Sequence, residues 1–502
     1  MNKYSKFFTL FLILSYFLSS CNALRSTDDG FGGGIKPAPY DIQFPTPTAL
    51  PERPQYTPGE LVEYIVQTGD TLPALASHFN TTVDRILAEN TFIPKDATTL
   101  PTGMPMQIPI YYRSFWGSAY QIIPDSHFVN GPLAMDFDTD VFIAQYPGWL
   151  NGYQEYAGGK TRSAGGVIDY VAQNFSVSPR LLLALIEFRA GGLSQPELPE
   201  EKTTYPLGYQ SSDHKGLYLQ LVWLANQLNN GYYQWRTGDL IEFDLSDGTT
   251  VRPDPWQNAA TVSIHMLFNQ FYSGEEYQQA IGPIGFAETY RQLFGDPWEK
   301  DIPHIPGSLQ QPLFTLPFEG GNIWAYTGGP HTGWGNGAPF AALDFAPPSK
   351  TGGCFYSLKW VTAIAPGLII RSGSGVVTLD LDEDGDERTG WVILYLHMSN
   401  NERVAAGTHV EMGDPIGHPS CEGGTSTGTH IHVARKYNGE WMVADSVLPF
   451  MMEGWIPHNG DAAYLGTLTR FEQTVIASNI GNLQSNIYAT GDPNGAPLSH
   501  TP

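Results

Sequence analysis

Basic residues are scarce in this chain of 502 residues. Lysine and arginine together number 26 against 50 aspartate and glutamate residues, which gives a formal net charge of −24. A surface of that sign repels phosphate groups, and no basic run is present that could neutralise a nucleic acid backbone. The composition therefore argues against nucleic acid as a partner.

Long hydrophobic runs are also lacking, apart from one at the N-terminus. Residues 7–18 are almost unbroken apolar sequence, preceded by Lys3 and Lys6. This run is short for a membrane-spanning helix, and a basic start, an apolar core and small residues before a cleavage point predict a secretory signal. Residues 18–21 read Leu-Ser-Ser-Cys, which resembles the bacterial lipoprotein signal. The resemblance implies a signal peptide over 1–20, lipidation of Cys21 and an extracytoplasmic protein attached to membrane or envelope by lipid alone; the alternative is an ordinary signal peptide with a chance cysteine.

Cysteine occurs only three times, as Cys21, Cys354 and Cys421. With Cys21 assigned to the lipoprotein signal, Cys354 and Cys421 remain as an even pair, and both lie in glycine-rich segments. Such a pair in an exported protein favours a disulfide over two buried thiols. We therefore expect these two cysteines to be bonded to each other.

The chain is too long for one ordinary core, so we expect several domains. Residues 21–60 are proline-rich without helical or strand period, which predicts a tether. Residues 61–112 alternate turn signals with apolar spacing in the order strand, helix, helix, strand. Residues 113–310 are mostly helical, with helices expected over 167–175, 179–190, 217–228 and 258–272. Residues 311–455 are expected to form strands over 360–370, 376–380, 391–397, 409–416 and 430–435. Residues 456–502 form a C-terminal extension, whose glycines suggest turns and a few more strands.

Residues 64–109 carry a family resemblance. The pattern Tyr64-x-Val66 followed by residues 69–72 (Gly-Asp-Thr-Leu), Asn90 and residues 103–109 resembles a LysM module over essentially its whole length. The resemblance implies a βααβ fold that binds glycans containing N-acetylglucosamine, such as peptidoglycan. The alternative is a small spacer of the same fold with no ligand.

The stretch 175–192 distantly resembles the core helix of lysozyme-like transglycosylases, where a glutamate at the helix end is the general acid. Arg189 stands at that position here, and Glu187 lies two residues away, about 200° around a helix. We therefore expect the domain to be noncatalytic. It is either lysozyme-like or simply a helical structural domain.

Histidine spacing gives the clearest chemical signal. His430 and His432 alternate, so both imidazoles share one face if they lie on a strand. His397 ends another apolar run, and His331 and Asp344 lie upstream in what is expected to be a glycine-rich loop. Three protein ligands with one open position for water is the usual arrangement of catalytic zinc.

The segments 363–367, 395–397, 413–417 and 426–432 resemble the lysostaphin-like (LytM-type) zinc endopeptidases of peptidoglycan, with coverage of about residues 320–450. The resemblance implies an antiparallel β domain with a groove for peptide and hydrolysis of stem or cross-link peptide bonds. It also implies that His331, Asp344 and His432 bind Zn²⁺. His397 and His430 would be the noncoordinating catalytic pair.

One departure from that family concerns the first ligand. The family places a histidine four residues before the aspartate, where this chain has Phe340, and His331 lies thirteen residues before Asp344. We expect the loop 332–340, with its permissive glycines, to bulge out and let His331 reach the site. The alternative is a zinc-free, degenerate domain in a lipoprotein that binds peptidoglycan or regulates another hydrolase. The four other site residues are present, which favours the enzyme.

An acidic segment, Asp380-x-Asp382-x-Asp384-Gly385, begins like a calcium-binding loop. Trp391 occupies the twelfth position, where the EF-hand pattern requires glutamate. Because the segment lies between two expected strands, we expect a solvated acidic hairpin; the alternative is calcium binding by residues 380–386.

Overall fold

The computed structural model describes residues 55–114 and 116–495. The expected signal peptide, Cys21 and most of the expected tether lie outside the described residues. Within the described part of the chain, no helix is both long enough and apolar enough to cross a membrane.

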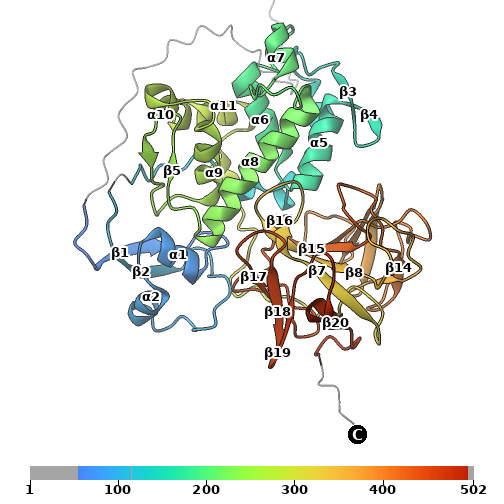
Figure 1. The fold of residues 1–502 in the computed structure, drawn as a ribbon. Helices are drawn as coiled ribbons and strands as arrows, with labels where there is room; N and C mark the ends of the chain where they lie inside the picture. Colours follow the sequence, from blue (N-terminus) through green and yellow to red (C-terminus); the bar gives the residue numbers. More distant parts are fainter. Residues whose placement is uncertain (1–54, 115, 496–502) are drawn as a thin grey trace, which may run out of the picture. The chain divides into compact units, whose positions relative to one another are not determined.

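The first folded unit has two strands and two helices (Figure 1). Its elements are β1 (Glu60–Ile65), α1 (Leu72–His78), α2 (Val83–Glu89) and β2 (Pro105–Ile110), with β1 antiparallel to β2. The side chains of Thr71 and Thr82 accept backbone N–H groups at the starts of the two helices. Phe79 and Ile86 are fully buried in the small core. The predicted βααβ order is confirmed.

The middle region is helical, as predicted. Its main helices are α5 (Ala164–Phe175), α6 (Pro179–Ala190), α8 (Leu217–Thr237) and α9 (Ala259–Phe268). Shorter helices and two hairpins complete it: α3 (Asp125–Phe128), α4 (Thr139–Ile143), β3 (Gln154–Ala157), β4 (Lys160–Ser163), α7 (Glu200–Thr204), β5 (Phe243–Asp244), β6 (Thr250–Val251), α10 (Gly274–Ile281) and α11 (Phe286–Phe294). Helix α6 is apolar on every side because it is enclosed by the others, and its residues 181–186 have no exposed surface.

Both polar side chains near the expected acid position at the end of α6, Glu187 and Arg189, form hydrogen bonds. Glu187 accepts the N–H groups of Leu193 and Ser194, which fixes the chain just after the helix. The Arg189 guanidinium donates to the carbonyl of Leu207 and to the hydroxyl of Tyr272. These contacts hold the end of the helix in place, and the expectation of a noncatalytic domain stays a prediction.

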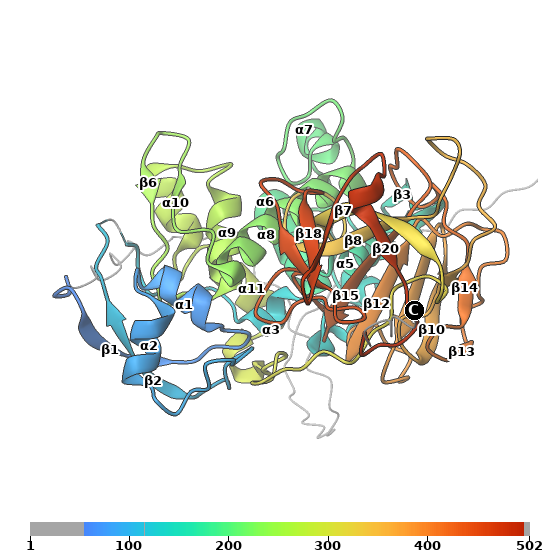
Figure 2. The ribbon, with the colours of Figure 1, turned by 60° about the horizontal axis from the view of Figure 1, so that its bottom comes forward.

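The C-terminal region is built on one antiparallel sheet of nine strands (Figure 2). The strand order is β13-β10-β11-β12-β15-β8-β7-β20, with β16 paired to β15. The strands are β7 (Ile323–Thr332), β8 (Phe340–Ala346), β10 (Gly367–Gly373), β11 (Val376–Asp380), β12 (Trp391–Leu396), β13 (His409–Val410), β15 (Ile431–Tyr437), β16 (Glu440–Trp441) and β20 (Asn486–Tyr488). The expected strands 360–370 and 409–416 are each interrupted, and their outer parts, β9 (Val361–Thr362) and β14 (Pro415–Gly417), pair with each other in a separate small sheet.

The C-terminal extension is part of this region. Strands β17 (Ile456–Asn459), β18 (Gly466–Arg470) and β19 (Gln473–Ile476) form a three-stranded sheet, and β20 adds to the main sheet beside β7. The boundary expected at residue 455 therefore does not separate two independently packed pieces.

The two faces of the main sheet have different neighbours. Leu343, Tyr395 and Val433 point into the core of the β region itself. Ala342 and Ala434 belong instead to the buried cluster that contains the helices of the middle region. Because alternate residues of a strand point to opposite faces, the middle region covers part of one sheet face.

Candidate metal site

The site begins with a cross-strand pair. His432 on β15 lies directly opposite Asp344 on β8 in the antiparallel register, so both side chains project from the same sheet face. Nδ1 of His432 is 3.2 Å from Oδ1 of Asp344. Asp344 therefore lies in a strand, and the expectation of a glycine-rich loop at this position is wrong.

A β-bulge brings His331 to the same face. Gly328 pairs with Asp344 and His331 pairs with Ala342, so β7 has two residues between these pairs where β8 has one. Without the extra residue, Pro330 would stand opposite Ala342 and His331 would point to the other face. A bulge before His331, within β7, thus sets the face to which His331 points. The loop predicted between His331 and Asp344 is the turn of the β7–β8 hairpin, residues 333–339, and it leaves Nε2 of His331 3.2 Å from Oδ1 of Asp344.

The turn of this hairpin is held by helix α8. The side-chain oxygen of Asn226 accepts the N–H of Asn336, and that of Asn230 accepts the N–H of Ala338. Gly328 is also constrained, since a Cβ atom there would lie 2.6 Å from Oδ2 of Asp344. Glycine at this position lets the Asp344 carboxylate lie against the backbone of β7.

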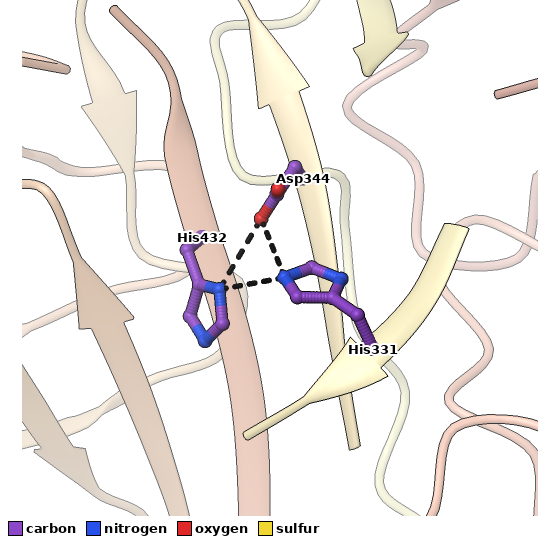
Figure 3. Close-up of side chains that lie close together, drawn as sticks. All are labelled: His331, Asp344 and His432. Carbon is purple, nitrogen blue, oxygen red and sulfur yellow. Dashed lines mark hydrogen bonds and ion pairs between the residues drawn. The ribbon is translucent and has the colours of Figure 1, made fainter. Parts of the chain in front are cut away.

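Three ligand atoms converge from three adjacent strands (Figure 3). Nε2 of His331 is 3.2 Å from Oδ1 of Asp344 and 2.9 Å from Nδ1 of His432. All three residues are at most 6% exposed. His331, whose unusual spacing from Asp344 left its place at the site open, therefore lies with Asp344 and His432 in one buried cluster.

Backbone carbonyls fix the tautomers of both imidazoles. Nδ1 of His331 bonds to the carbonyl of Gly329 at 2.8 Å, and Nε2 of His432 bonds to the carbonyl of Gly333 at 3.1 Å. A carbonyl only accepts, so these nitrogens carry the protons, and in the neutral rings Nε2 of His331 and Nδ1 of His432 present lone pairs.

This donor set fits a metal cation. Two nitrogen lone pairs and the carboxylate Oδ1 of Asp344 face one another, and that buried oxygen has no hydrogen-bond partner among the described residues. Three electron-pair donors at this distance repel one another unless a cation lies between them. Two imidazoles and one carboxylate with a remaining open position is a typical donor set for catalytic zinc.

Two further imidazoles lie beside the cluster. The rings of His397 and His430 are 4.4 Å apart between centroids, and Nε2 of His430 is 3.6 Å from Oδ2 of Asp344. Their Nδ1–H groups donate to the carbonyls of Glu422 and Gly428, both at 2.8 Å. In each neutral ring Nε2 is therefore the nitrogen that can accept a proton.

Burial and neighbouring side chains together set the charge states of His397, His432 and Asp344. It lowers the pKa of His397 to about 4 and also lowers the pKa of His432, so both rings are neutral near pH 7. Burial alone would raise the pKa of Asp344, but the neighbouring His331 and His430 outweigh it and hold that pKa well below its usual value. A neutral imidazole at His432 and an ionised carboxylate at Asp344 are the states that bind a metal.

Tyr464 is a neighbour of the site that the sequence patterns do not reveal. Its ring stacks on that of His331 with centroids 4.1 Å apart, and its carbonyl accepts the N–H of Gly329 in the bulge at 2.8 Å. It lies in the extension after residue 455, which shows no motif. Only the three-dimensional contact between the extension and β7 identifies it.

The disulfide lies next to the second imidazole pair. Cys354 and Cys421 are bonded to each other. Glu422, which follows Cys421, supplies the carbonyl that orients His397, and the carbonyl of Gly353, which precedes Cys354, accepts the N–H of Thr429. The disulfide therefore joins two loops: one holds Thr429, the residue before His430, and the other holds His397.

A cavity of about 1050 Å³ adjoins the site. Its walls come from α5 of the middle region and from the β10–β11 hairpin, and it reaches Glu422 and Gly423 beside His397. Trp334, at the turn of the β7–β8 hairpin, also lines it. None of the five site residues lines the cavity, which approaches them through Glu422, whose carbonyl holds His397.

An antiparallel sheet that carries two imidazoles and a carboxylate on one face, with two further imidazoles alongside, is the arrangement typical of mononuclear metallohydrolases. Comparison with known proteins narrows this class. The chain is 32% identical over 137 residues to the beta-lytic metalloendopeptidase of Lysobacter enzymogenes, which covers 26% of this chain and 71% of that protein. It is 25% identical over 338 residues to protease LasA of Pseudomonas aeruginosa (strain UCBPP-PA14), covering 63% of this chain and 74% of that protein. The chain belongs to the family of these enzymes, the M23 metallopeptidases.

Two family models match the regions before the sheet. The LysM domain matches residues 64–109, and the N-terminal domain of LasA matches residues 121–307. The second match gives the helical region a family that the sequence patterns did not, and the lysozyme-like resemblance remains an unsupported prediction. Among solved structures, the M23 metalloprotease pseudoalterin aligns with a TM-score of 0.28 and 26% identity, covering 33% of this chain and 96% of that one.

Proposed function

We propose that this protein is a zinc endopeptidase of the bacterial cell wall that hydrolyses stem or cross-link peptide bonds of peptidoglycan. The observation that carries the proposal is the convergence of His331 Nε2, Asp344 Oδ1 and His432 Nδ1, with each imidazole proton already donated to a backbone carbonyl. The neutral donors are thereby prepared for a cation before it arrives. Membership of a metallopeptidase family and the LysM match support the same conclusion.

The proposed roles follow from the free nitrogens. Zinc, when bound by His331, Asp344 and His432, supplies a Lewis acid and a water of lowered pKa. His397 and His430 each keep Nε2 unprotonated and turned away from the carbonyl that holds Nδ1. One of them accepts the proton of the attacking water at Nε2. The Nε2–H formed in this way can then donate to the oxygen that becomes negatively charged and pass its proton to the leaving amine, while the Nε2 of the other imidazole accepts a hydrogen bond from the water and orients it.

In this proposal, the regions before the peptidase domain bring the enzyme to its substrate. Residues 61–112 bind the glycan strands and so raise the local concentration of the attached peptides at the site. Residues 1–20 direct export and Cys21 carries the lipid, which places the enzyme outside the cytoplasm. Nε2 of His331 lies 3.2 Å from Oδ1 of Asp344, which supports zinc binding over the zinc-free alternative.

The test is incubation of the purified protein with purified peptidoglycan. We expect new amino termini to appear when one equivalent of zinc is present, to stop with a chelator, and to resume when zinc is restored. Binding to peptidoglycan without new amino termini, at full zinc occupancy, would instead support the regulatory alternative.

Replacing His397 with alanine separates catalysis from metal binding. Because His397 holds no metal in this proposal, zinc content should stay near that of the wild type while kcat falls by about 10²–10⁴, the usual range for a general acid or base. His409→Ala is the matched control, since its side chain is 67% exposed on β13 and should leave both values unchanged. Loss of zinc in His397→Ala would make His397 a ligand, and an unchanged kcat would remove it from the mechanism.

A further inference from the structure

The β11–β12 hairpin holds a second group of converging carboxylates. Oxygen atoms of Asp380, Asp382 and Asp384 lie within 4.8 Å of one another. Asp382 and Asp384 are exposed, but Asp380, the last residue of β11, has no exposed surface. The expectation of a fully solvated acidic hairpin is therefore wrong for Asp380.

Only one of the two carboxylate oxygens of Asp380 has a hydrogen-bond partner among the described residues. Its Oδ2 accepts the N–H of Gly385 at 2.9 Å, whereas its Oδ1 is buried and has no hydrogen-bond partner among the described residues. A buried carboxylate oxygen without a donor carries a substantial free-energy cost. A ligand that contacts Oδ1 would remove that cost.

The side chains clustered with Asp380 are negatively charged, so a bound cation would stabilise its ionised form. Burial, together with the neighbouring Asp382 and Asp384, raises the pKa of Asp380 to about 7, so the ionised form is disfavoured in the protein alone. The nearby basic side chains have other partners, since Arg388 pairs with Asp386 and His409 with Glu383. Among the described residues, no lysine or arginine forms an ion pair with any of the three clustered carboxylates.

We propose that Asp380, Asp382 and Asp384 form a calcium-binding site distinct from the His331–Asp344–His432 cluster. An all-oxygen donor set favours a hard cation over zinc, and calcium tolerates the irregular geometry of a loop better than magnesium. The three aspartates occupy the first, third and fifth places of a loop whose sixth residue, Gly385, has φ +86°. With Trp391 at the twelfth place, water completes the coordination, and binding falls at the weak end of protein calcium sites, about 10⁻⁴–10⁻³ M.

The loop that carries this site also contacts the middle region. The Arg388 guanidinium donates to the carbonyl of Ala134 at 2.9 Å, and Glu387 accepts from the side-chain amide of Gln173. Glu387 also pairs with Arg371 at 3.2 Å, within the β region. Calcium would therefore order the segment through which the sheet and the helices are joined.

Calcium titration of the full chain, loaded with zinc throughout, tests the proposal. We expect calorimetry to give one site and the unfolding temperature to rise with calcium. Asp382→Asn combined with Asp384→Asn should weaken binding at least about tenfold, because two charged ligands are lost at exposed positions. Asp384 also accepts the N–H of Asp386 and the hydroxyl of Thr389, so the unfolding temperature of the calcium-free variant is compared with that of the wild type. Glu383→Gln is the matched control: it removes one charge from the same loop, its carboxylate lies at His409, and binding should change less than about twofold.

Three results would overturn the site. These are no binding by the wild type up to about 10 mM calcium, equal binding by the double variant, or an equal loss in Glu383→Gln, which would mark diffuse attraction to an acidic loop. Peptidase activity is not the readout, so the calcium site and the proposed function stand or fall separately.

Discussion

Replacing His331 with alanine is expected to reduce zinc from about one per chain to near zero and to lower peptidase activity by at least about 10³-fold. Loss of a group that only orients a metal ligand already weakens metal binding about 10–100-fold, and this substitution removes one of three proposed protein ligands. The remaining pair, Asp344 and His432, cannot by itself hold a catalytic zinc tightly. Metal analysis of the purified protein and assay on peptidoglycan measure the two effects.

His331→Ala also tests the β-bulge. The side chain is buried and stacks on Tyr464, so folding is checked by circular dichroism and by the unfolding temperature. His409→Ala serves again as the histidine control outside the site. If the variant keeps its zinc and its activity, then His331 is not a ligand, and the convergence seen in Figure 3 has another cause.

Local sequence patterns predicted much of the fold. Helix α6 was expected over 179–190 and β11 over 376–380, and both have those limits. Each signal is local: a proline at the first helical turn, or an apolar run ended by a turn. The alternation of His430 and His432 likewise predicted two imidazoles on one face of a strand.

The position of His331 could not be read from such patterns. Gly328, Gly329 and Pro330 look like turn residues, so β7 and β8 were missed as strands. The face to which His331 points depends on one extra residue in β7 relative to β8, and register is a property of two paired strands. Tyr464 and β20 were missed for the same reason, since both are placed by contacts with β7 that are distant in sequence.

Arg236 joins all three folded regions through one buried guanidinium. From helix α8 it contacts Asp125 Oδ2 at 3.1 Å and Glu440 Oε1 at 3.3 Å, and it donates to the carbonyl of Thr68 in the LysM module. Nε2 of His304 contacts the second oxygen of Glu440 at 2.6 Å. Arg236→Met keeps much of the volume and removes the charge.

We expect Arg236→Met to destabilise the protein by about 3–5 kcal/mol, because it leaves the buried carboxylate of Asp125 without its guanidinium partner and that of Glu440 with His304 alone. Arg252→Met is the matched control: its guanidinium pairs with Glu242 at the surface, where an ion pair contributes at most about 1 kcal/mol. Thermal and denaturant unfolding measure the difference. Similar small losses in both variants would show that the Arg236 contacts contribute no more than a surface pair.

The dependence on pH gives a second measure of the same network. Burial would raise the pKa of Glu440, but Arg236 and His304 outweigh it and lower that pKa from 4.5 to about 2. A carboxyl whose pKa is depressed by folding stabilises the protein above its unfolded pKa, and the contribution is lost as pH falls from about 4.5 towards 2. In Arg236→Met the largest opposing charge is gone, so this part of the acid destabilisation should shrink, and the two proteins should differ less in stability at pH 3 than at pH 7. A difference that stays constant over this range would mean that the charge of Glu440 is not what Arg236 stabilises.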